Sequence, residues 1–386
     1  GFVIGGALPA ALAADWLATT WDQNAGLVVC GPSAAVVEEV VGDWLKELLP
    51  VPSSASFALV TGCQMAHTTC LAAARHGVLA RAGWDVERDG LTGAPRVRIL
   101  AGAKRHTTID RSLRLLGLGT AAIVEIPADD QGRMQVDALA AALRSSEGPT
   151  VVCAQAGEVN TGSFDELEPI ADLVERSGAW LHVDGAFGLW AAASPRLRGL
   201  VAGAERADSW ATDAHKWLNV PYDCGIAFVA DSEPHRAAMA VRAAYLVQDA
   251  AARDQMDWTP EFSRRARGFA VYAALRSLGR RGVAALVEAS CDRAVQFAER
   301  ISTIEGCEVL NDVVLNQVLF RFADDGTTNA VLADVQASGE AWMAGTTWDG
   351  RAAIRLSVSN WRTSESDIDR TAAAFEAAMS TASTAR

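Results

Sequence analysis

The chain has 386 residues, of which 50% are hydrophobic and 21% charged, a composition typical of a globular protein large enough for two domains. Its formal net charge of -13 and sequence pI near 5.0 argue against nucleic acid or an anionic membrane surface as a partner, because both would be repelled. A small-molecule substrate is expected instead.

The cysteines and histidines show no pattern of a disulfide framework or a metal site. Seven cysteines are scattered through apolar sequence without a C-x-x-C pair, which favours free thiols and a cytoplasmic location. Six histidines lack H-E-x-x-H or similar spacing, so no metal is expected. No stretch approaches the ~20 uninterrupted apolar residues of a membrane span.

In chain order, strand and helix patterns alternate through the first two thirds of the sequence. Residues 1–16 indicate a glycine-rich loop that runs into a helix, and they lack the basic leader of a targeting signal. Residues 36–49 have apolar side chains at the helical period. Short apolar runs then predict strands at 57–62, 96–100, 121–127, 150–157, 179–188 and 225–231. Helical patterns separate most of these strands, at 65–83, 134–146 and 165–178.

This alternation predicts a mainly parallel sheet with helices on both faces, in which ligands bind where strands end and helices begin. From about residue 263 a long helical region is followed by strands and a final helix, which predicts a smaller α+β domain. We expect an N-terminal loop and helical segment at 1–50, a large domain at 51–262 and a small C-terminal domain at 263–386.

Two candidate residues, Asp184 and Lys216, follow apolar runs. Asp184, in LHVDGAFGLW, ends a predicted strand where an unpaired carboxylate is costly to bury, although many Asp-Gly pairs are turns or helix caps. Lys216, in TDAHKWLNVPYDCG, is one of only three lysines among 34 basic residues. Lysine, unlike arginine, can lose its proton when desolvated and attack a carbonyl carbon to form a Schiff base. The two residues therefore indicate an acid and an amine at the carboxyl edge of one sheet.

The motifs H-V-D-x-A-x-G, A-D-S and H-K-W-L occur in this order, with the lysine expected last in its strand. Their order and spacing resemble the pyridoxal-phosphate enzymes of the aspartate aminotransferase fold, fold type I, and within them the group II amino-acid decarboxylases. The resemblance covers nearly the whole chain. It implies a seven-stranded sheet in a large domain that binds pyridoxal 5'-phosphate. It further implies decarboxylation of an L-amino acid to the amine and CO2, through an external aldimine and a quinonoid, in a homodimer with its active site at the subunit interface.

The resemblance assigns roles around the cofactor. Lys216 would hold it as an internal aldimine, Asp184 would pair with the pyridine nitrogen, and Ala186 would pack against one ring face. His106, in AKRHTTIDRS, matches the histidine that stacks on the opposite face near the substrate carboxylate, while a surface histidine before a helix is the alternative. His215 matches the family histidine that reaches the phosphate.

A phosphate group requires backbone N–H groups at a helix start. The stretch VTGCQMAHTTCL offers a strand, a glycine and then a helix, so Gly62, Cys63 and Gln64 are the candidates, although the family commonly has Gly-Ser or Ala-Ser followed by Glu. Asp213 replaces the asparagine that is common in the decarboxylases. Because its carboxylate would repel a phosphate dianion, we expect Asp213 to point elsewhere and Thr212 to contribute instead.

The segment QAGEVNTGSFDEL corresponds to the part of the family that approaches the ring hydroxyl of the cofactor. Glu158 and Val159 replace the usual Thr-Thr pair, which leaves Asn160 or Thr161 as the contact. An Asn-Thr-Gly turn explains the same residues equally well.

The resemblance also guides the choice of reaction. Tyr245 lies after Lys216 at the family spacing of a mobile-loop tyrosine that protonates the substrate carbon, although a helix-packing tyrosine is the alternative. A carbon-carbon lyase or aldolase is the nearest rival, since D-x-H-K also resembles the phosphosphingolipid lyases. An aminotransferase would use Arg355 for the α-carboxylate, but we expect Arg355 to be an exposed strand residue. A non-catalytic pyridoxal-phosphate-binding protein is the last alternative. Twelve tryptophans and eleven phenylalanines favour an aromatic or bulky L-amino acid.

Overall fold

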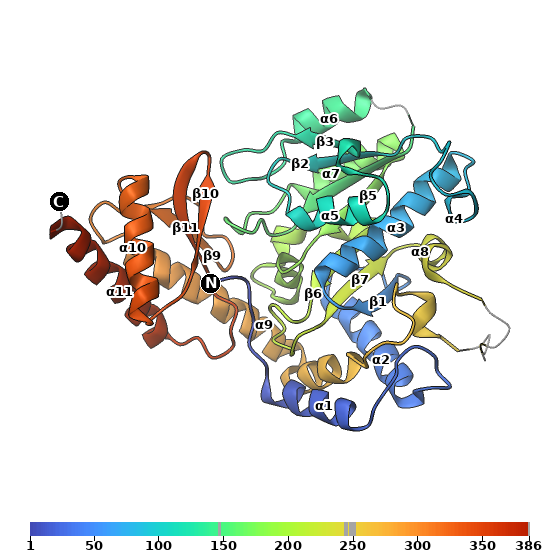
Figure 1. Ribbon diagram of the computed structural model, residues 1–386, viewed down its shortest axis with the longest axis horizontal. Helices are drawn as coiled ribbons and strands as arrows, with labels where there is room; N and C mark the ends of the chain where they lie inside the picture. The colour runs from blue at the N-terminus through green and yellow to red at the C-terminus, as the bar shows by residue number, and fades with distance from the viewer. Residues whose placement is uncertain (146–147, 243–245, 247–251, 385–386) are drawn as a thin grey trace.

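The computed structural model describes residues 1–145, 148–242, 246 and 252–384 and is built around a seven-stranded sheet (Figure 1). Strands β2 to β6 run parallel, whereas β7 is antiparallel to both of its neighbours, β6 and β1. The spatial order is β1 (Ser56–Val60), β7 (Gly225–Val229), β6 (Ser209–Asp213), β5 (Trp180–Asp184), β4 (Thr150–Gln155), β2 (Arg98–Gly102) and β3 (Ile123–Ile126). The predicted mainly parallel, seven-stranded sheet is confirmed.

Helices cover both faces of this sheet, so most of its strands are buried along their whole length. One face packs against α3 (Cys63–Arg81), α4 (Val86–Asp89) and α5 (Thr107–Leu115). The other packs against α2 (Pro32–Leu48), α6 (Val136–Arg144), α7 (Leu167–Ser177) and the first part of α9 (Gly268–Ile301). Two further helices, α1 (Pro9–Thr20) and α8 (Ser232–Met239), contact α9 and α3 respectively.

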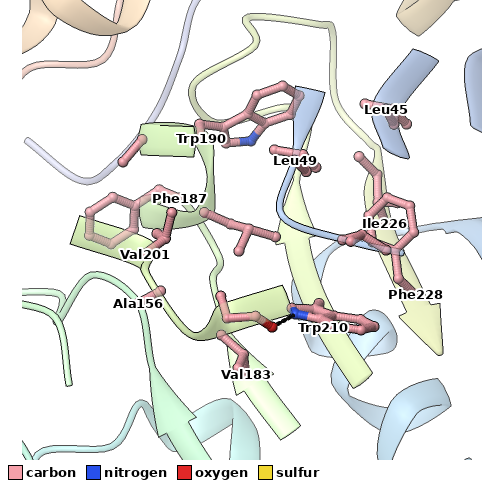
Figure 2. Close-up of a cluster of buried hydrophobic side chains, with 14 of the residues drawn as sticks. Leu45, Leu49, Ala156, Val183, Phe187, Trp190, Val201, Trp210, Ile226 and Phe228 are labelled. Carbon is pink, nitrogen blue, oxygen red and sulfur yellow. Dashed lines mark hydrogen bonds between the residues drawn. The ribbon is translucent and has the colours of Figure 1, made fainter. Parts of the chain in front are cut away.

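The second face carries the larger apolar core (Figure 2). Trp210 of β6 and Trp190, which follows β5, are fully buried, and each indole N–H donates to a backbone oxygen, of Ala204 and Asp213 respectively. Each side chain of this size contributes roughly 1.5–3 kcal/mol through burial. Because Trp190 bonds to the last residue of β6, the core fixes the sheet edge at which Asp213 lies.

A second, antiparallel sheet lies toward the C-terminus, in the order β10 (Ala344–Trp348), β11 (Arg351–Ser357), β9 (Gln317–Arg321) and β8 (Glu308–Val309). Helices α10 (Asp325–Ser338) and α11 (Glu365–Thr384) and the end of α9 pack with it around a cluster of phenylalanines. The expected smaller α+β unit is confirmed (Figure 1).

Helix α9 joins the two sheets. It changes direction at Gly279, whose φ of 61° and ψ of 176° are not helical, and continues to Ile301. Side chains up to Cys291 pack in the larger core, whereas those from Ala294 onward pack in the smaller one. The boundaries expected near residues 50 and 262 therefore stay a prediction, because α9 contributes to both cores. No helix in the described ranges is both long and apolar enough to cross a membrane.

The glycine-rich start of the chain lies directly over the turn that contains Lys216. The Gly6 N–H donates to Asn219 Oδ1 at 2.6 Å, and the Leu8 N–H donates to Asn219 O at 2.8 Å. A Cβ atom on Gly5 would overlap the backbone oxygen of Lys216. Only glycine permits this close approach of two backbones.

We predict that Gly5→Ala lowers the free energy of unfolding by about 1–3 kcal/mol, because the added methyl group forces the two segments apart. Chemical denaturation followed by tryptophan fluorescence measures this. Gly199→Ala is the matched control, since nothing lies within 4 Å of its Cβ position, and it should change stability by less than about 0.5 kcal/mol. Equal effects of the two substitutions would contradict a stabilising role for this close approach.

Candidate active site

Two acids and one amine meet at the carboxyl edge of the large sheet. Asp184 ends β5 and Asp213 ends the neighbouring parallel strand β6. Lys216 lies in the turn after β6 and not, as expected, at the last position of the strand. Its Nζ is 3.1 Å from Asp213 Oδ2. Burial alone would lower the pKa of Lys216, but the charges of Asp213 and Asp184 raise it above its ordinary value.

The carboxylate of Asp184 is buried, and neighbouring groups compensate its negative charge. Its Oδ1 accepts a hydrogen bond from the Ala186 N–H at 3.1 Å and lies 3.4 Å from His67 Nε2. Burial would raise the pKa of Asp184, but His67, His106 and Lys216 lower it well below its usual range. Asp184 is therefore an anion at neutral pH, as a partner for a protonated ring nitrogen must be.

His67 is oriented by a second buried histidine. His67 Nδ1 lies 2.9 Å from His182 Nε2, and His182 Nδ1 lies 3.0 Å from the hydroxyl of Ser209. Desolvation lowers the pKa of His182 to about 3, with a further contribution from the charge of His67, so His182 is neutral near pH 7. A neutral ring has one N–H and one acceptor nitrogen, which lets it fix the His67 ring with Nε2 toward Asp184.

Sequence reasoning missed both histidines, although a signal was present. His67 is four residues after Cys63 on a predicted helix, so both side chains lie on one helix face. His182 is two residues before Asp184 on a strand, so these side chains leave the same face of the sheet.

The side chains of Cys63, His67 and Asp184 also have the spacing of metal ligands, since their donor atoms lie within 4.8 Å of one another. The sequence alone does not predict that these three side chains meet, because Asp184 is far from Cys63 and His67 along the chain. However, Cys63 Sγ already contacts His67 Nε2 at 3.3 Å, and burial raises the pKa of the Cys63 thiol well above its model-peptide value. A protonated thiol is a poor metal ligand.

The helix start that was expected to cradle phosphate is present, but the Cys63 N–H already has a partner, and phosphate binding there stays a prediction. Helix α3 begins at Cys63, after Gly62 with a φ of 144°. A Cβ on Gly62 would lie 3.0 Å from the His215 ring. The Cys63 N–H donates to Asp213 Oδ1 at 2.6 Å, so the expectation that Asp213 points elsewhere is wrong. The short amide contact and the nearby amine hold the carboxylate in the cradle.

The side chains of Thr212 and Gln64 both point away from the expected phosphate site. Thr212 alternates with Asp213 along β6 and pairs with Ile226, whose side chain belongs to the core on the opposite face of the sheet. Its hydroxyl therefore cannot replace Asp213 in the cradle. The side chain of Gln64 donates to Thr108 O and Ser112 Oγ, which directs it toward α5 and leaves only its backbone N–H as a candidate.

His106 is an exposed residue at the start of α5, which is the surface alternative that the sequence allowed. Its Nδ1 accepts the Thr108 N–H at 3.3 Å and so caps α5, which leaves Nε2 as the protonated nitrogen of the neutral ring. Desolvation lowers the pKa of His106, and the charges of Asp184 and Lys216 act on it as well. His106 thus lies within electrostatic reach of both residues, while stacking on the cofactor stays a prediction, as does the packing of Ala186 against it.

The segment after β4 favours the turn over a cofactor contact. The carboxylate of Glu158 accepts the backbone N–H groups of Asn160 and Thr161 at 2.6 and 2.8 Å. The Thr161 hydroxyl donates to Gln131 O at 2.7 Å, and the Asn160 amide donates to Glu158. Asn160 is thus engaged within the turn, and the Thr161 hydroxyl is engaged with the backbone of Gln131. Tyr245 lies outside the described residues.

Arg355 is only 7% exposed, so the expectation of an exposed strand residue is wrong. Its Nη1 donates to Val159 O at 3.0 Å, and its guanidinium lies 5.9 Å from the ring of Phe2. Its buried Nε has no hydrogen-bond partner among the described residues. The charge of Arg355 also reaches His106, which places a guanidinium within electrostatic range of the candidate site.

Together these groups fit pyridoxal phosphate. The amine of Lys216 can bond to an aldehyde, and the anion of Asp184 can pair with a pyridinium nitrogen. The first turn of α3 and His215 can bind a phosphate group in a cradle too tight for a side chain at residue 62.

Comparison with known proteins decides the family. Residues 5–323 match the family described as the pyridoxal-dependent decarboxylase conserved domain. The chain belongs to this family. The L-2,4-diaminobutyrate decarboxylase of Rhizobium meliloti (strain 1021) is 32% identical over 378 residues, 93% of this chain and 73% of that protein. The aromatic-L-amino-acid decarboxylase of Bacillus atrophaeus is 28% identical over 376 residues, 92% of this chain and 75% of that protein.

Solved structures share the fold of this decarboxylase. A crystal structure of Oryza sativa TDC with PLP and tryptamine has a TM-score of 0.91 at 24% identity, covering 98% of this chain and 82% of that one. The Catharanthus roseus tryptophan decarboxylase in complex with L-tryptophan has a TM-score of 0.88 at 21% identity, with coverage of 98% and 82%. The decarboxylase thus uses pyridoxal phosphate to remove the carboxylate of an amino acid. The predicted family, cofactor and reaction are confirmed, in preference to the lyase, aminotransferase and non-catalytic alternatives.

Proposed function

We propose that this decarboxylase acts on an L-amino acid with an aromatic or otherwise bulky side chain. Several aromatic rings lie around the charged groups of the site and support this substrate class. Lys216 Nζ lies 6.0 Å from the ring of Phe187, and Tyr222 packs on His215 with ring centroids 4.3 Å apart. Near Arg355, the ring of Phe2 packs on Trp342 at 5.2 Å. Such rings bind flat apolar side chains well.

The acidic groups near Lys216 argue against a substrate with a side-chain ammonium. Asp184 is paired with His67, Asp213 is paired with Lys216, and Glu158 is committed to its turn. A second substrate cation would have to take one of these partners away, because a buried charge needs a partner of its own.

Each charged residue has a distinct task in the proposed reaction. Bound pyridoxal phosphate supplies an electron-accepting ring, and Asp184 keeps a proton on its ring nitrogen. Lys216 must lose a proton before it can act as a nucleophile, and Asp213 Oδ2, 3.1 Å away, is a suitable acceptor. We assign Arg355 and the Nε2–H of His106 to the orientation of the substrate carboxylate. Tyr245 stays our candidate for protonation of the substrate carbon.

We predict that kcat/KM for L-tryptophan, L-tyrosine or L-phenylalanine exceeds that for L-2,4-diaminobutyrate by at least about tenfold, because the aromatic rings are desolvated and the ammonium finds no free carboxylate. Release of CO2 and formation of the amine measure the reaction. Lys216→Ala is the inactive control. A preference for diaminobutyrate would overturn the substrate proposal and leave the reaction class intact.

The proposed assembly is a homodimer formed through the face of α1 and the loop that follows it. Helix α1 buries Ala11 and Ala18 against the rest of the protein. Trp16, on the other side of the helix, is 65% exposed, and Trp21, which ends the helix with one edge against Phe269, is 54% exposed, with Val29 close by in sequence at 61%. Exposed apolar residues in such a group are typical of a protein interface. The free state of the described cysteines supports the cytoplasmic location that we also propose.

We expect the wild-type protein to have twice its 40.7 kDa chain mass by light scattering. The double substitution Trp16→Glu and Trp21→Glu should produce monomers, because charges would be buried at the interface. Leu115→Glu, at a residue 62% exposed on α5, is the control and should leave the mass unchanged. An active wild-type monomer would contradict both the dimer and the shared active site.

A further inference from the structure

Three hydrogen-bond donors surround the carboxylate of Asp213, whose side chain is 2% exposed. The Cys63 N–H, at the first position of α3, donates to Oδ1 at 2.6 Å. Lys216 Nζ lies 3.1 Å from Oδ2, and His215 Nε2 lies 3.4 Å from Oδ1. The carboxylate thus contacts a helix N-terminus, an amine and an imidazole at once.

The proton position on His215 follows from its other hydrogen bond. The Cys224 N–H donates to His215 Nδ1 at 3.0 Å, so Nδ1 is an acceptor. The proton of the neutral ring is therefore on Nε2, the nitrogen that faces Asp213. Consequently all three neighbours present hydrogen atoms to the same carboxylate.

Two of these donors, the Cys63 amide at the start of α3 and the His215 N–H, are of the kind that a phosphate group requires, whereas Lys216 is the amine that bonds to the cofactor aldehyde. A Cβ atom on Gly62 would lie 3.0 Å from the His215 ring, so only glycine leaves room for an anion there. The family match identifies the expected anion as the phosphate of pyridoxal phosphate. The phosphate would carry about 1.5 to 2 negative charges near pH 7 and would meet a carboxylate that already holds the donors.

We propose that Asp213 is a resident counter-anion of the cofactor-free enzyme, which the cofactor phosphate must displace from the Cys63 amide and the His215 ring. In the absence of cofactor the carboxylate balances Lys216 and the end of α3, two positive groups that are costly to leave buried without a partner. On cofactor binding, the phosphate takes over the Cys63 amide and the His215 N–H. Asp213 therefore weakens cofactor binding and makes the cofactor exchangeable. The proposal rests on the cofactor alone and is independent of the substrate proposed above.

Asp213→Asn tests this directly, because the amide oxygen can still accept from the Cys63 N–H while the negative charge is lost. Apoprotein is titrated with pyridoxal phosphate and, separately, with pyridoxal, which lacks the phosphate, and binding is followed by absorbance. We expect the gain in affinity for pyridoxal phosphate to be at least about tenfold larger than any change for pyridoxal, because pyridoxal reports only the loss of the charge beside Lys216. Inorganic phosphate should also compete at lower concentration in the variant.

Asp208→Asn is the matched control. Asp208 lies just before the other end of β6 and accepts a backbone N–H as Asp213 does, from Leu181 at 2.7 Å. This substitution should leave both affinities unchanged. Circular dichroism checks the fold of each variant, and Asp213→Ser serves as a second neutral replacement if the asparagine variant does not fold.

Unchanged or weaker binding of pyridoxal phosphate by folded Asp213→Asn or Asp213→Ser would overturn the proposal. An equal gain for pyridoxal would overturn it too, since the effect would then not depend on the phosphate. The titration uses no amino acid, so its failure is distinct from a failure of the substrate assignment, which CO2 release measures.

Discussion

The structure depends on two buried carboxylates at the carboxyl edge of the large sheet, each of which needs a partner that compensates its charge. Asp184 and Asp213 end neighbouring strands, and each has a partner within 3.4 Å, His67 for the first and Lys216 for the second. A buried carboxylate without such a partner would take up a proton. Because both are paired, the site holds two anions and a cation in fixed positions before any cofactor arrives, and this order is what electrostatic catalysis requires.

The rest of the fold serves to hold these partners in position. Helix α3 brings Cys63 and His67 to the sheet from one face, where the backbone amide of the first meets Asp213 and the ring of the second meets Asp184. On the other face Trp190 bonds to the backbone of Asp213. The chain start crosses over Lys216 at a glycine. The apolar core and the charged edge are thus parts of one packed unit, and a change in either will affect the other.

The sequence predicted the architecture well because its signals are local. Apolar runs and helical periods identify strands and helices, and the motifs around Asp184 and Lys216 resemble those of the family in order and spacing. The failures concern side chains whose neighbours are distant in sequence. Repulsion from a phosphate suggested that Asp213 points away, yet the amide of Cys63, 150 positions earlier, attracts it. Arg355 resembled a surface strand residue, but the chain around Val159 and Phe2 buries it.

We propose that Lys216 carries the cofactor beside an anionic Asp184. Treatment of the cofactor-loaded enzyme with sodium borohydride, followed by proteolysis and mass spectrometry of the peptides, tests it most directly. We expect the cofactor to become permanently attached to the peptide that contains Lys216 and to neither of the peptides with Lys46 or Lys104. Attachment at another lysine, or no attachment in a protein that still releases CO2, would contradict it.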